Sequence, residues 1–79
     1  MKKEIVKIII IKTVNSPTVL QRILQIIKRR RINIRRFTAR EIDPDHGFVK
    51  VEVDAEAEQV RLLAAQIEKQ VDVIAIKSL

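Results

Sequence analysis

The sequence predicts an α+β sandwich in which two helices cover one face of a four-stranded antiparallel sheet. Three features of the chain lead to this prediction. An almost unbroken run of isoleucine and valine stands near the start, two later segments carry apolar residues at helical spacing, and a pair of alternating segments lies between them. The resulting order is strand, helix, strand, strand, helix, strand.

The first strand is predicted from Ile5 to Lys12, and because it is apolar on both faces we place it inside the sheet. A helix is expected to follow from Pro17 to about Arg30. Ser16 is the predicted N-cap, whose hydroxyl can accept a hydrogen bond from the first turn. Pro17 suits the first helical position, because the N–H that proline lacks would have no partner there.

This helix carries a wide apolar stripe. Its predicted core consists of Leu20, Ile23, Leu24 and Ile27. Val19 and Ile26 widen the stripe on one flank. Core packing and a dimer interface both explain such a width, and we favour an interface at Val19 and Ile26 because so small a domain gains stability from a partner.

The second strand is predicted from Ile32 to Ile42. Continuing the helix would carry Arg31 over the core stripe, so the helix should end before this residue. The residues expected to face the core occupy every second position of this strand, but the alternation shifts by one residue before Phe37. A β-bulge at Arg35 and Arg36 would restore the register.

A hairpin and a second crossover complete the chain. Turn formers fill Asp43 to Gly47, and the segment from Phe48 to Val53 alternates cleanly. Asp54 is the predicted N-cap of a second helix, and Val71 to Lys77 is the last strand. The core stripe of the second helix is Ala57, Val60, Leu63, Ala64 and Ile67. Right-handed crossovers then give a ferredoxin-like βαββαβ sandwich with the first strand central and one sheet face free for a covering partner.

Length and composition indicate a single domain, residues 1–79, with a globular balance of apolar and charged residues. The absence of cysteine excludes disulfides, thiolate metal sites and thiol redox chemistry. No apolar run reaches the roughly 20 residues of a membrane span, and no signal peptide is visible. We therefore expect a cytoplasmic protein without a membrane partner.

No catalytic constellation is present, so we expect no enzyme activity and no metal site in this chain. His46 stands alone in a turn, and the acidic residues fall in different elements. Gly47 is the only glycine, which excludes a Gly-rich phosphate loop.

The net charge of +6 raises the alternative of an RNA-binding module. Cations run from Lys28 to Arg31 and recur at Arg35, Arg36 and Arg40. Stabilisation of the helix dipole explains the first three of them. RNA recognition on an open sheet needs aromatic stacking platforms, and Phe37 is expected to face the core, which leaves Phe48 alone. Nucleic acid is therefore the less favoured partner.

Three segments resemble one known family. These are Asn15 to Ile23, the run Arg31-Ile32-Asn33-Ile34, and Gln66 to Val73, where a helix passes into the last strand through Lys-x-Val-Asp-Val. In this order and spacing they are similar to the ACT domain of the acetohydroxyacid (acetolactate) synthase small regulatory subunit, in its short single-domain form. The likeness runs from about Val6 to Leu79.

The resemblance implies a non-catalytic regulatory subunit that activates the catalytic subunit of acetolactate synthase. Thiamine diphosphate, Mg²⁺ and FAD would belong to that partner only. Family members form dimers through their ACT domains and bind a branched-chain amino acid, typically valine, at the interface. The implied effector-binding residues are Asn15, Ser16, Pro17, Thr18 and Val19 of the elbow between strand and helix, with Asn33 and Ile34 contributed by the neighbouring subunit.

Two positions depart from the family pattern. Thr18 stands where the family favours glycine, and its Cβ limits how closely a ligand approaches the backbone. Arg31 stands where glycine usually follows the helix, which predicts either a strained left-handed Arg31 or a differently wound helix end. For Asn15, capping the turn beside Ser16 is an alternative to ligand binding. A free-standing amino-acid sensor for another partner is a further alternative.

Overall fold

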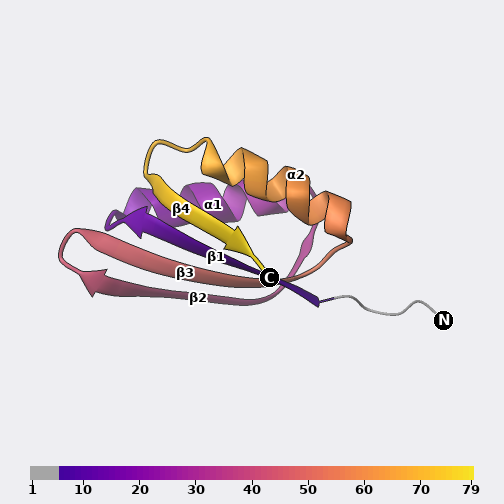
Figure 1. Ribbon diagram of the computed structural model, residues 1–79, viewed down its shortest axis with the longest axis horizontal. Coiled ribbons are helices and arrows are strands. Elements are labelled where there is room, and N and C mark those ends of the chain that lie inside the picture. The colour runs from indigo at the N-terminus through magenta and orange to yellow at the C-terminus, as the bar shows by residue number, and fades with distance from the viewer. Residues whose placement is uncertain (1–5) are drawn as a thin grey trace.

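The structure is a computed structural model that describes residues 6–79. Its elements are β1 (Val6–Val14), α1 (Pro17–Arg29), β2 (Asn33–Asp43), β3 (His46–Asp54), α2 (Ala57–Glu68) and β4 (Val73–Ser78). The strands form one four-stranded antiparallel sheet in the order β2-β3-β1-β4, and both helices lie on the same side of it (Figure 1). This confirms the ferredoxin-like sandwich and the interior position of the first strand, whose predicted start at Ile5 lies outside the described residues.

The core forms where β1 and β3 turn alternate side chains toward the helices. Ile9 and Ile11 of β1 are fully buried, as are Val49, Val51 and Val53 of β3. The residues between them point to the other side, which we call the open face. Neither helix of residues 6–79 is long and apolar enough to cross a membrane.

The buried face of α1 is centred differently from the prediction. Val19 and Ile26 are only 1% and 7% exposed and belong to the core. Leu20 and Leu24 are half-buried, and Leu20 packs against the edge of the core. The apolar stripe of α1 is wider than one contact surface. Which side of it is buried depends on how α1 is oriented between the sheet and α2, and helical spacing alone does not determine that orientation. Core packing thus accounts for Val19 and Ile26, and both have little surface left for a second copy.

The end of α1 contains a strained residue. Arg31 has a φ of 55°, the left-handed region that favours glycine. The N–H of Arg31 donates a hydrogen bond to the carbonyl of Lys28 at 3.0 Å. The N–H of the preceding residue, Arg30, donates to the carbonyl of Ile27 at 3.2 Å. The chain thereby turns so that Ile32 is buried, at 7% exposure. Of the alternatives predicted for the helix end, the left-handed Arg31 is confirmed.

The predicted bulge in β2 is also confirmed. Ile34 pairs with Val53 and Arg36 pairs with Glu52, so Arg35 is the additional residue. A second irregularity at Ile42 precedes the turn. Bulges are common in edge strands such as β2, where they bend the strand.

One predicted cap and one predicted boundary were wrong, and a second predicted cap is confirmed without its hydrogen bond. Asp54 ends β3 and is not the N-cap of α2; Glu56 is, and it forms a capping box with Gln59. The reason is that β3 continues through Asp54, so the chain needs further residues to reach the helix axis. Ser16 is the N-cap of α1 but makes no side-chain capping bond. The last strand begins at Val73, because Val71 lies in the preceding turn and is 85% exposed.

Candidate functional site

A surface cavity of about 270 Å³ lies at the elbow between β1 and α1. Asn15, Ser16 and Pro17 line it on one side. Leu20 of α1 and Phe48 of β3 contribute apolar surface. The elbow predicted from the sequence therefore borders a hollow of small-molecule size.

The local sequence explains the sharp bend at this elbow. Ser16 is extended, with φ −142° and ψ 130°, and Pro17 fixes the first helical residue. The N–H of Val19 donates to the Ser16 carbonyl at 3.3 Å. The Ser16 hydroxyl forms no capping bond to the first turn, which is the positive end of α1.

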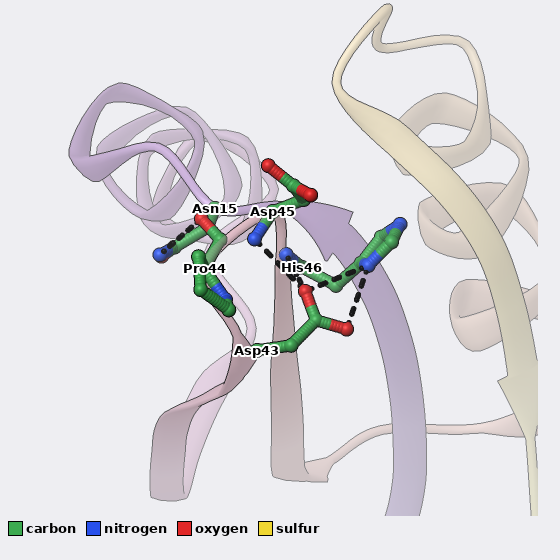
Figure 2. Close-up of polar contacts among 5 residues, drawn as sticks. All are labelled: Asn15, Asp43, Pro44, Asp45 and His46. Carbon is green, nitrogen blue, oxygen red and sulfur yellow. Dashed lines mark hydrogen bonds and ion pairs between the residues drawn. The ribbon is translucent and has the colours of Figure 1, made fainter.

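Asn15 fixes the elbow to the β2–β3 turn (Figure 2). Its backbone N–H donates to the carbonyl of Asp45 at 2.9 Å, and its side-chain Nδ2 donates to the carbonyl of Pro44 at 3.2 Å. Asn15 therefore has a structural role, but it links the elbow to a distant turn and does not cap the chain beside Ser16. What the side chain still offers a ligand is its Oδ1 atom, an acceptor.

The turn itself is organised by Asp43. Its carboxylate accepts the backbone N–H groups of Asp45 and His46 at 2.8 and 2.9 Å and lies 2.9 Å from His46 Nδ1 (Figure 2). The hydrogen bonds with His46 and Asp45 hold the pKa of Asp43 below its ordinary value. Within residues 6–79, no three His, Cys, Asp or Glu side chains cluster as metal ligands. His46 contacts the carboxylate of Asp43 within the turn.

Gly47 allows β1 and β3 to approach closely beside the cavity. A Cβ added to this residue would lie 2.9 Å from Thr13 Oγ1, closer than side chains normally pack. On the adjacent strand, the Arg40 guanidinium lies over the Phe48 ring at 5.2 Å from its centroid. None of the predicted effector residues included Leu20, Gly47, Arg40 or Phe48, which also line this cavity.

The remaining predicted effector residues do not join this cavity within one chain. Thr18 is exposed outside its lining, and Val19 is buried in the core. Asn33 and Ile34 pair with Asp54 and Val53, near the start of β1. The elbow follows the other end of β1, and the usual rise of a strand separates the two ends of β1 by about 26 Å.

Asn33 has a structural partner at its own end of the sheet. Its Nδ2 donates to Asp54 Oδ2 at 2.8 Å, and Arg35 Nε donates to the same oxygen at 3.1 Å. Asp54 therefore orients both residues at the start of β2. The structure thus brings Asn15, Ser16 and Pro17 together and separates them from Asn33 and Ile34.

Solved structures share this fold at low sequence identity. The ACT domain of GTP pyrophosphokinase from Chlorobium tepidum matches with a TM-score of 0.83 and 15% identity, over 98% of this chain and 100% of that chain. The acetolactate synthase small subunit from Thermotoga maritima matches with a TM-score of 0.82 and 19% identity, over 94% of this chain and 47% of that chain. A homoserine dehydrogenase from Thiobacillus denitrificans matches with a TM-score of 0.80 and 16% identity, over 98% of this chain and 17% of that chain.

The family comparison is more specific than these structural similarities. A comparison with curated protein sequences gave no match. The family described as "AHAS small subunit-like ACT domain", where AHAS is acetohydroxyacid synthase, matches residues 3–75. Because this match covers nearly the whole sequence, the chain belongs to the family of AHAS small subunit-like ACT domains.

Proposed function

We propose that this chain is a non-catalytic regulatory subunit that activates the catalytic subunit of acetolactate synthase. The observation that carries the proposal is the family match over residues 3–75, together with a cavity at the elbow where the family pattern predicts an effector. The thiamine diphosphate, Mg²⁺ and FAD of the reaction would be held by the catalytic partner. This chain would contribute binding energy and geometry only.

A homodimer would complete the effector site. In the sheet, β2 runs parallel to β1, so Asn33 begins β2 at the end of the sheet opposite the elbow. A two-fold axis that pairs two β2 edges antiparallel would bring Asn33 of one copy toward the elbow end of the other. Pairing through the edge formed by β4 would not, because β4 lies on the far side of β1.

The flank of the molecule beside β2 has the apolar surface that such a dimer needs. Leu20 and Leu24 of α1 and Ile34 and Phe37 of β2 are only half-buried. Leu20, Ile34 and Phe37 also pack against the core. A second copy on this flank would remove their remaining apolar area from water. We therefore place the proposed dimer contact at these residues in preference to the buried Val19 and Ile26.

The cavity suits the proposed ligand, a branched-chain amino acid. The Oδ1 atom of Asn15 can accept a hydrogen bond from the ammonium group. The positive end of α1, where Ser16 makes no side-chain capping bond, can attract the carboxylate. Leu20 and Phe48 offer apolar surface to the side chain. The volume of about 270 Å³ lies just below the range of drug-sized ligand sites.

Reconstitution tests the proposed function directly. A purified acetolactate synthase catalytic subunit is assayed for acetolactate output with increasing amounts of this chain, with and without valine, leucine or isoleucine. A rise in output supports the proposal, and no rise at any stoichiometry rejects it. Calorimetric binding of an amino acid without activation would instead identify a free-standing sensor for another partner.

Sedimentation velocity tests the dimer separately. At tens of micromolar the unaltered chain should sediment as a dimer, and Leu24→Glu should shift it to a monomer because a charge would enter the apolar contact. Gln25→Glu is the matched control, since Gln25 is exposed on the same helix. A monomeric unaltered chain would refute the dimer and leave activation to be decided by the reconstitution.

A further inference from the structure

The open face of the sheet carries a compact group of cations. Ile10 and Lys12 of β1 point to this face, since Ile9 and Ile11 are buried on the other. Strand register places their neighbours. Lys12 pairs with Phe48, which pairs with Arg40, while Ile10 pairs with Lys50 on one side and Lys77 on the other. Four cations from four strands thus surround one isoleucine and one phenylalanine; we call Lys12, Arg40, Lys50 and Lys77 the basic patch.

The described part of the chain does not neutralise the basic patch. Within residues 6–79, none of its members forms an ion pair. The carboxylates on the same face have other partners. Glu52 lies 3.6 Å from Arg36, Asp54 lies 3.0 Å from Arg35, and Asp43 lies 2.9 Å from His46. Of the β2 arginines considered for RNA binding, Arg35 and Arg36 are therefore compensated. Arg40 belongs to the basic patch, which has no carboxylate partner among residues 6–79.

The chemistry of this patch favours a protein partner over single-stranded nucleic acid. Bases need free aromatic faces for stacking. Arg40 already covers one face of Phe48 at 5.2 Å, and Phe37 packs against the core. Half-buried Ile10 lies between Lys50 and Lys77, and half-buried Ile8 continues the apolar strip along β1 beside Glu52. Val6 and Val14, each 41% exposed, are at the two ends of β1. An apolar strip rimmed by cations complements a protein surface with an apolar centre and an acidic rim.

We propose that the open face docks an acidic surface of a protein partner, with the basic patch supplying the charge complementarity. Under the proposed function, on which this inference rests, the partner is the catalytic subunit of acetolactate synthase. The open face does not include the flank beside β2 that the proposed dimer uses. A dimer would therefore present two such faces to its partner.

Charge reversal with a matched control tests the surface. In Lys12→Glu/Lys50→Glu, affinity for the catalytic subunit should fall about tenfold or more, with a slower association rate and a flatter salt dependence. Lys12→Arg/Lys50→Arg keeps the charge and should bind normally. Lys28→Glu/Arg29→Glu makes the same change in net charge on exposed residues at the end of α1 and should bind within about twofold of the unaltered chain. Circular dichroism melting verifies that each variant is folded.

The outcomes separate this inference from the function on which it rests. If the unaltered chain binds and activates the catalytic subunit and Lys12→Glu/Lys50→Glu does so equally well, the docking surface is wrong while the function stands. Equal losses in the control and in the open-face variant would also overturn it, because binding would then follow net charge alone. The unaltered chain is also tested for binding of single-stranded RNA. If it binds RNA and only the open-face variant loses this binding, the patch is assigned to nucleic acid and the proposed protein docking is overturned. If the unaltered chain neither binds nor activates, the proposed function fails first.

Discussion

Replacing Arg31 by glycine should stabilise the domain. Arg31 holds a φ of 55°, and the left-handed region costs a residue with a Cβ about 1 to 2 kcal/mol. Glycine removes that strain but adds about 0.4 to 1 kcal/mol of conformational entropy to the unfolded chain. The net gain expected is therefore about 0.5 to 1 kcal/mol. For a domain of this size it corresponds to a rise in Tm of about 3 to 6 °C.

The experiment compares glycine with alanine at the same position. Both substitutions remove the exposed guanidinium, but Arg31→Ala keeps the Cβ and hence the strain. Urea unfolding, followed by circular dichroism at one protein concentration, gives the free energy of unfolding of each variant. The difference between them isolates the backbone contribution. If Arg31→Gly were no more stable than Arg31→Ala, the assignment of strain to the end of α1 would be refuted.

Three further substitutions test other parts of the structure. Gly47→Ala should destabilise the fold by about 1 to 3 kcal/mol, because its Cβ would lie 2.9 Å from Thr13 Oγ1. In a double-mutant cycle, adding Thr13→Ala to the same chain should recover part of that loss. Glu56→Ala should cost about 1 kcal/mol in thermal unfolding through loss of the capping box, whereas a smaller effect than that of Glu58→Ala would contradict the cap. Asp43→Asn should flatten the pH dependence of unfolding in acid: the lowered pKa means that the carboxylate stabilises the fold above about pH 3.8 and loses this effect as the pH falls below it. If urea titrations gave Asp43→Asn the same loss of stability in acid as the unaltered chain, the Asp43–His46 contact would be refuted.

Local chemistry allowed the elements and their order to be predicted. Pro17 marks the start of α1, and the parity change before Phe37 located the bulge at Arg35. The position of Arg31 indicated a break because continuing the helix would have buried a guanidinium. Each of these inferences depends on a few neighbouring residues, which is why the sequence alone was sufficient.

Predictions that depend on the placement of whole elements were less accurate. A stripe that includes Val19, Leu20, Leu24 and Ile26 can be rotated about the helix axis, and only contact with the sheet and α2 decides which side is buried. The N-cap of α2 was assigned to Asp54 because aspartate is a common cap. The length of β3, however, is set by its pairing with β1.

The candidate site was predictable only in part, for a related reason. The family pattern identifies Asn15 and Asn33, but they lie at opposite ends of the sheet in one chain. The contributions of Arg40, Gly47 and Phe48 come from a hairpin that folds back beside the elbow. A short motif does not encode such proximity, because it arises from strand register.

The two proposed surfaces use different side chains, and this predicts two separable defects. The dimer contact involves Leu24 and its neighbours beside β2, whereas partner docking involves Lys12 and Lys50 on the open face. Lys12→Glu/Lys50→Glu should therefore lose the catalytic subunit yet still dimerise and bind an amino acid in calorimetry. Leu24→Glu should lose amino-acid binding, because the elbow of one copy would no longer meet Asn33 of the other, while the open face remains intact. If Leu24→Glu also abolished association with the catalytic subunit, docking would require both copies at once, and the open face of one chain would not be a sufficient binding surface.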